Sequence, residues 1–170
     1  MGRVKPQDPN EPKSLWMRGL SWAARQRPVT WYLVNVGGHV DPVLMKISGG
    51  RLKSTINAPT VVLTHTGAKS GKVRRNPLGY FSDGDDVILI ASKGGAEHNP
   101  AWYHNIRANP DVELWTGGDA GGRYRAREAE GKERERLSDL ATTFYEGFAG
   151  YQERADKRTI PVIVCSPIDG

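Results

Sequence analysis

Residues 60–82 constrain the fold more than any other stretch, because two strand-like runs flank a short turn bounded by glycines. Residues 60–66, TVVLTHT, are β-branched and apolar, which predicts a strand. Residues 73–82, VRRNPLGYFS, combine aromatic and apolar residues with a proline bend and predict a second strand. Gly67–Gly71 is then the tip of a hairpin. Two strands joined by so short a turn pair antiparallel.

Four more strands and two helices are predicted after this hairpin. The strands fall at residues 86–92, 111–116, 122–129 and 159–165, and the helices at residues 100–108 and 131–146. Asn99 is expected to cap the first helix, with Pro100 at its first position. About six strands, mostly linked as hairpins with helices between them, favour an antiparallel barrel with peripheral helices over a doubly wound sheet.

The amino-terminal third differs in character from the rest. Residues 1–13 hold three prolines and many polar residues, which predicts a disordered lead. Residues 14–56 are expected to form a helical region, and residues 57–170 the cofactor-binding barrel domain. The first predicted helix, residues 14–26, is basic and carries tryptophans. Residues 14–27 therefore suit peripheral contact with an anionic membrane, although the same helix could pack on the barrel or shield a ligand.

Composition and charge narrow the choice of partners and of compartment. A chain of 170 residues suits one domain with a sizeable core. A net charge of +5 favours an anionic partner, such as a phosphorylated ligand, nucleic acid or an acidic membrane surface. Cys165 is the single cysteine and lies in an apolar run, so we expect a buried hydrophobic side chain rather than a disulfide or a nucleophile. No signal peptide or membrane span is recognised, and we expect a cytoplasmic protein.

The turn GAKSGK resembles a nucleotide-binding P-loop only superficially. Three residues rather than four separate Gly67 from Gly71, and Val73 follows Lys72 where a hydroxyl residue is needed. Pro77 also prevents the helix that a P-loop requires. The glycines do allow backbone N–H groups to approach an anion closely, and cations surround them. The turn therefore fits either an anion clamp or an ordinary solvated basic hairpin.

Several other chemistries lack their signatures. The sequence contains no G-x-G-x-x-G and no G-x-S-x-G, and its four histidines lack the spacing of a metal site. No metal is therefore expected. The remaining basic turns and aromatic residues suit a ligand with a phosphate and a flat ring, or single-stranded nucleic acid. A non-enzymatic module that binds nucleic acid or an anionic membrane thus stands as the alternative to an enzyme.

Three segments resemble the deazaflavin-dependent nitroreductase family of actinobacteria, over roughly residues 58–166. They read THTGAKSGKVRRNPLGYF, ASKGGAEHNPAWYHNIRANPDVEL and RTIPVIVC. The resemblance implies a split β-barrel and the deazaflavin coenzyme F-420, whose phosphate and oligoglutamate tail are anionic. It also implies hydride transfer from the reduced coenzyme to an electron-poor acceptor: a quinone, an activated alkene or a nitroaromatic. Nucleic acid is not expected as a partner in that case.

The resemblance also assigns roles to particular residues. The implied cofactor-binding residues are Lys69, Ser70, Arg74, Asn76, Pro77, Ala91, Ser92, Lys93, Gly94, Trp102, Tyr103 and Asn105. The implied catalytic set is Tyr145, Phe148, Tyr151 and Ser92, in which the aromatic residues cover the acceptor and Tyr145, Tyr151, Ser92 or water donates a proton. Phe148 stands where family members often carry tyrosine, which counts against nitro-drug reduction. Because Gly147 and Gly150 disfavour a continuous helix, we expect a mobile loop here, closing as a lid; filling of the core is the alternative.

Overall fold

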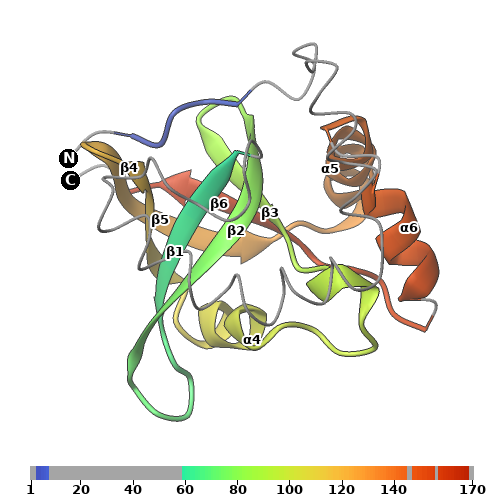
Figure 1. The fold of residues 1–170 in the computed structure, drawn as a ribbon, viewed down its shortest axis with the longest axis horizontal. Helices are drawn as coiled ribbons and strands as arrows, with labels where there is room; N and C mark the ends of the chain where they lie inside the picture. The colour runs from blue at the N-terminus through green and yellow to red at the C-terminus, as the bar shows by residue number, and fades with distance from the viewer. Residues whose placement is uncertain (1–2, 8–58, 145–146, 156, 169–170) are drawn as a thin grey trace.

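The structure is a computed structural model that describes residues 3–7, 59–144, 147–155 and 157–168. Six strands in this part of the chain form a closed barrel in the order β1-β2-β3-β6-β5-β4, and every neighbouring pair is antiparallel (Figure 1). The strands are β1 (Thr60–Thr66), β2 (Val73–Asp83), β3 (Asp86–Ile90), β4 (Asp111–Gly117), β5 (Ala120–Glu128) and β6 (Val162–Pro167). The predicted antiparallel barrel with peripheral helices is confirmed.

The barrel has one core inside and a second core on its outer face. Neighbouring residues of β2, β3 and β6 alternate between the two, because successive strand side chains point to opposite faces. Tyr80 and Leu89 belong to the inner cluster, whereas Phe81 and Ile88 belong to the outer one. Helix α5 (Gly131–Phe144) covers the outer cluster through Leu137 and other apolar side chains. Strands buried on both faces explain the unbroken apolar runs of β3 and β6.

Two shorter helical elements connect the strands. The turn η2 (Lys93–Gly95) follows β3 and leads into α4 (Ala101–Ala108), whose apolar side packs into the inner core. Asn99 does not cap α4 as predicted: Pro100 occupies the N-cap position, and the Asn99 side chain instead accepts a hydrogen bond from Arg158. The chain ends α4 at Asn109, as predicted.

The segment after α5 differs from its prediction. Gly147–Arg154 forms helix α6 despite its two glycines, so a mobile loop is the wrong description of these residues. Packing accounts for the difference, because α6 lies against both α5 and η2 (Figure 1). Tertiary contacts can offset the roughly 1 kcal/mol that each glycine costs a helix. Strand β6 also begins later than predicted, directly after Pro161, which has no N–H to donate to a ladder.

Residues 3–7 are packed on the barrel, so the prediction of a disordered lead is wrong for them. Val4 is 5% exposed and belongs to the inner core. Its N–H donates to the Tyr124 hydroxyl, and the Tyr80 hydroxyl donates to the carbonyl of Lys5. The other predicted amino-terminal features, including the tryptophan-bearing helix at residues 14–26, lie outside the described residues. In the described part of the chain, no helix has the length and apolar character needed to cross a membrane.

Candidate cofactor-binding site

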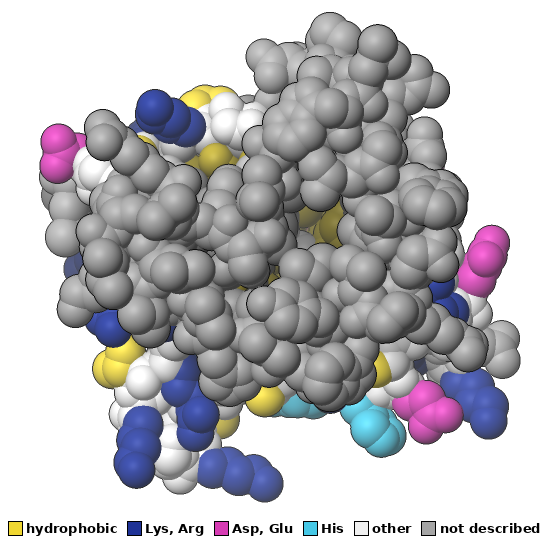
Figure 2. Space-filling model, in the orientation of Figure 1, with side chains coloured by type: hydrophobic (Ala, Val, Ile, Leu, Met, Phe, Trp, Pro, Cys, Tyr) yellow, Lys and Arg dark blue, Asp and Glu magenta, His cyan; other side chains and the backbone are white. Residues whose placement is uncertain are grey.

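The tip of the β1–β2 hairpin is a compact basic surface. The Gly67 N–H donates to the carbonyl of Lys72 at 2.9 Å, and the Gly71 N–H donates to the carbonyl of Gly67 at 2.8 Å. Four exposed cations surround this turn, at Lys69, Lys72, Arg74 and Arg75. Figure 2 shows Lys and Arg side chains gathered where Figure 1 places the hairpin. None of the four forms a salt bridge within the described residues, so their charge is available to an anion.

Gly67 and Asn105 fix the shape of this tip. A Cβ at Gly67 would lie 2.7 Å from the Ser70 hydroxyl and 3.2 Å from Nε of Arg74, so a larger residue would displace both side chains. The Ala68 N–H donates to the side-chain oxygen of Asn105 on α4 at 3.0 Å. Helix α4 therefore holds the hairpin tip, and it lies between this tip and the η2 turn in the view of Figure 1.

The η2 turn has backbone geometry suited to binding an anion or a carbonyl oxygen. Ser92 is right-handed helical, with φ −72° and ψ −37°, whereas Lys93 has φ +49° and Gly94 has φ +66°. A right-handed residue followed by a left-handed one directs successive N–H groups into a shared concavity, called a nest. Lys93 is also the one non-glycine residue with positive φ in the described chain. Such a conformation is uncommon for lysine and is typically found at functional sites.

Helix α6 approaches this turn very closely at Gly95. A Cβ at Gly95 would lie 2.8 Å from the carbonyl oxygen of Tyr151 and 2.8 Å from Cβ of Arg154. Nε of Arg154 donates to the carbonyl of Gly94 at 3.3 Å, and its guanidinium lies 4.9 Å from the centre of the Tyr151 ring. The structure thus places the backbone of Tyr151 next to Gly95, at the end of the η2 turn.

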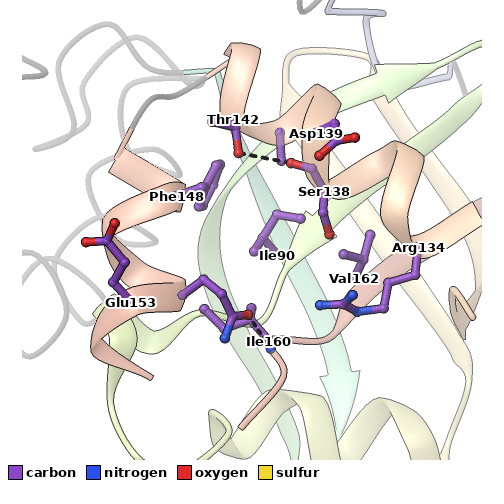
Figure 3. Close-up of a pocket in the computed structure, with 11 residues that line it drawn as sticks. Ile90, Arg134, Ser138, Asp139, Thr142, Phe148, Glu153, Ile160 and Val162 are labelled. Carbon is purple, nitrogen blue, oxygen red and sulfur yellow. Dashed lines mark hydrogen bonds between the residues drawn. The ribbon is translucent and has the colours of Figure 1, made fainter. Parts of the chain in front are cut away.

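Phe148 lies one turn before Tyr151 on α6, and the centroids of the two rings are 5.8 Å apart. Phe148 packs against the outer core and lines a cavity of about 440 Å³ between α5 and α6, with Ile90 and Val162 on the floor (Figure 3). Arg134 enters the same cavity from α5, and its buried Nε has no hydrogen-bond partner among the described residues. Phe148 therefore contacts both the outer core and the Tyr151 ring. Tyr145, the third aromatic residue of the predicted catalytic set, lies outside the described residues.

Trp102 and Tyr103 occupy the inner core. They are 6% and 4% exposed, and the Tyr103 hydroxyl donates to the Glu128 carboxylate at 2.8 Å. Burial, followed by this hydrogen bond, raises the pKa of Tyr103. Their rings are therefore not free to stack on a ligand, and α4 offers Asn105 to the site instead.

The remaining predicted binding residues lie on β2 and at the end of β3. Nε2 of His65 and the side-chain oxygen of Asn76 are 2.9 Å apart and hydrogen-bonded, which fixes the orientation of the Asn76 amide. Pro77 lies next to Asn76 on β2, opposite Val62 of β1. Ala91 is buried and joins β3 to the nest. The side chains of Arg154 and Arg158, which bind carbonyls of the turn, were not predicted, although Arg158 begins the motif RTIPVIVC.

Comparison with known proteins identifies the family. The family described as F420H(2)-dependent quinone reductase matches residues 40–167. An F420H(2)-dependent quinone reductase of Mycobacterium tuberculosis is 47% identical over 72 residues, covering 41% of this chain and 48% of that protein. A second M. tuberculosis protein named for the same activity is 39% identical over 109 residues, covering 64% of this chain and 90% of its own length. The chain thus spans about half the length of the first relative and most of the second.

A solved structure supports the same assignment. A structure described as an F420-H2 dependent reductase, FDR-A, is 43% identical and superposes with a TM-score of 0.58, covering 64% of this chain and 94% of that one. Another, described as a domain-swapped dimer, is 37% identical with a TM-score of 0.60, covering 74% of this chain and 95% of that one. The predicted resemblance to F420-dependent reductases is therefore confirmed, and the chain belongs to the F420H(2)-dependent quinone reductase family.

Proposed function

We propose that this protein is a reductase that uses F420H2 to reduce a quinone. The observation that carries the proposal is the placement of a basic hairpin and a backbone nest on either side of α4 in the view of Figure 1. A ligand with an anionic tail at one end and a flat polar ring at the other matches those two features. F420H2 bound there would supply a hydride to the quinone, and a proton from solvent or a protein hydroxyl would complete the hydroquinone.

The donor groups fit the chemistry of this coenzyme. Lys69 and Arg74 would bind its phosphate or tail carboxylates through charge-assisted hydrogen bonds, with Ser70 beside them. Asn76 would donate through its amide nitrogen, because its oxygen is already paired with His65. The N–H groups of Ser92, Lys93 and Gly94 would bind a carbonyl edge of the ring system, with Ala91 and Pro77 alongside. Asn105 would act through the hairpin tip that it holds in place.

Tyr151 and Ser92 are the two described residues of the predicted catalytic set that carry a hydroxyl. Tyr151 belongs to α6, which packs directly on the nest. A positioned hydroxyl can donate the proton that accompanies hydride transfer, typically accelerating a reaction at least about 100-fold. Tyr145 is a third candidate. An activated alkene or a nitroaromatic would need the same two partners, hydride and proton, and these two classes are the alternative acceptors.

The alternative of a nucleic-acid-binding module is weakened by burial of the aromatic residues. Proteins that bind single strands stack bases on exposed aromatic rings beside a basic groove. Trp102 and Tyr103 are instead buried in the core. The basic hairpin alone could bind RNA through phosphate contacts, so RNA serves as the competing ligand in the test.

The deciding experiment is a titration of the protein with oxidised F420, followed by the fluorescence of the coenzyme. We expect Lys69→Ala, Arg74→Ala and Lys93→Ala each to weaken binding by roughly 1–3 kcal/mol, the range for hydrogen bonds to charged groups. Added salt should weaken wild-type binding, because exposed charges are screened. Lys132→Ala, which removes an exposed charge at the start of α5, is the matched control and should bind normally. Failure of the wild type to bind F420 while it binds FMN or RNA would refute the proposal.

Turnover then distinguishes the acceptors. The assay compares the rates at which F420H2 reduces three acceptors, each at the same concentration: a soluble quinone, a ketone-conjugated alkene and a nitroaromatic. We expect the quinone to be reduced with the highest kcat/KM. If the protein binds F420 tightly but does not reduce the quinone, coenzyme binding is supported and the proposed quinone reductase activity is refuted.

A further inference from the structure

Arg158, in the loop between α6 and β6, makes an unusual set of hydrogen bonds. Its Nε donates to the carbonyl of Ala96 at 2.8 Å, and one Nη donates to the side-chain oxygen of Asn99 at 2.6 Å. The other Nη donates to the carbonyl of Ser92 at 2.9 Å and reaches that of Ala91 at 3.5 Å. One guanidinium therefore contacts four residues of a single segment, residues 91–99.

These contacts involve a partly buried charge without a carboxylate. Within the described residues, Arg158 forms no salt bridge, and all of its partners are neutral oxygen atoms. Burial lowers the pKa of Arg158, but a guanidinium remains charged at neutral pH. Withdrawing a cation from water is costly unless its donors are satisfied, so a rigid set of four acceptors is what stabilises it here. Arg158 is thus stabilised by residues 91–99, and the conformation of those residues is in turn held by Arg158.

The arrangement also explains how the nest keeps its shape. A left-handed conformation is unfavourable for lysine and persists only where the surroundings fix it. The bonds to Ser92 and Ala96 hold the backbone on both sides of Lys93. The carbonyl of Ser92 accepts from Arg158, that of Lys93 from the Ala96 N–H and that of Gly94 from Arg154, which leaves the N–H groups of the turn as the polar groups open to a ligand.

We propose that Arg158 is a positioning residue for the coenzyme: it holds residues 91–99 so that the Ser92–Gly94 nest is preformed before the coenzyme binds. The inference rests on the proposed function, because the nest is where the coenzyme ring would bind. Lysine cannot replace arginine in this role, since an ammonium group lacks the planar fork that reaches four acceptors at once.

The test is the affinity for oxidised F420 of Arg158→Lys and Arg158→Ala. Misplacing a bound group by about 1 Å can cost on the order of 100-fold in catalysis, and we expect affinity to fall by about 10- to 100-fold in both variants. Millimolar guanidinium ion, added to Arg158→Ala, should restore part of the affinity by occupying the vacated site. Arg136→Ala is the matched control: it removes an arginine that binds the Asp83 carboxylate on the surface and should leave F420 affinity unchanged.

The outcomes separate positioning from a general structural role. Thermal unfolding is recorded for every variant. A lower Tm with wild-type F420 affinity in Arg158→Lys would overturn the inference, as would absence of rescue by guanidinium. If both Arg158 variants fail to fold, Asn99→Ala, which removes one acceptor, decides: a several-fold loss of affinity supports the inference and unchanged affinity overturns it. Wild-type protein that does not bind F420 at all refutes the proposed function instead.

Discussion

Substituting Gly95 by alanine should detach α6 from the turn that it packs on. Gly95 has φ +82°, a conformation that costs an L-residue roughly 1–2 kcal/mol. The added methyl carbon would also lie 2.8 Å from the Tyr151 carbonyl oxygen and 2.8 Å from Cβ of Arg154. Both are atoms of α6 close to its backbone, so they cannot move aside as the end of a flexible side chain can.

The expected magnitude follows from two separate costs. Overpacking a well-packed contact typically costs about 1–3 kcal/mol. Added to the backbone cost of roughly 1–2 kcal/mol, this gives about 2–5 kcal/mol for Gly95→Ala. A helix of eight residues at the edge of the fold can relieve that strain by local opening rather than by global unfolding. We therefore expect α6 to open while the barrel stays folded.

Amide hydrogen exchange of residues 147–154, together with chemical denaturation, measures both effects. Gly118→Ala is the matched control, because Gly118 has φ +52° and a Cβ added there would meet no atom within 4 Å. It should lose only the backbone cost and leave exchange in α6 unchanged. If Gly95→Ala is no more destabilised than Gly118→Ala and exchange in α6 does not rise, the reasoning from this contact is wrong.

Four further expectations follow from other parts of the molecule. Burial raises the pKa of Cys165 to about 12, so the thiol should resist alkylation at pH 8, and rapid labelling of native protein would contradict this. The same shift stabilises the folded protein fully below the pKa of about 8.5 that the thiol has in the unfolded chain. This stabilisation should be lost as the pH rises from there towards 12. Phe148→Tyr should change Tm and leave acceptor preference unaltered, because Phe148 lines the α5–α6 cavity. A shift in preference towards acceptors that take a hydrogen bond would instead support a role for Phe148 in covering the acceptor. Tyr145→Phe removes a hydroxyl and should lower turnover without changing the affinity for F420. Deleting residues 14–27 keeps Val4 in the core and should abolish any co-sedimentation with anionic vesicles if that helix binds membranes; equal sedimentation of both forms would exclude it.

The strands could be predicted from sequence because their signals are local. Alternation of arginine with Tyr124 and Ala126 identified the two faces of β5, and the hairpin at Gly67–Gly71 followed from the residues on either side. The motifs on the hairpin, the η2 turn and α4 identified the family. Local patterns also placed the cations of the hairpin tip at a turn, where they are exposed.

Long-range contacts decided the rest. Gly147 and Gly150 argued for a loop, yet packing against α5 and η2 holds α6 as a helix. Asn99 had the residue type of a helix cap, but an arginine 59 positions away takes its side-chain oxygen. Trp102 and Tyr103 looked like ligand-stacking residues and are instead core, because α4 turns that face inwards. Local sequence determined which segments are strands and where positive charge gathers. Only the closed barrel could decide which side of each helix is buried and which distant arginine holds the η2 turn, because both depend on contacts between residues far apart in the chain.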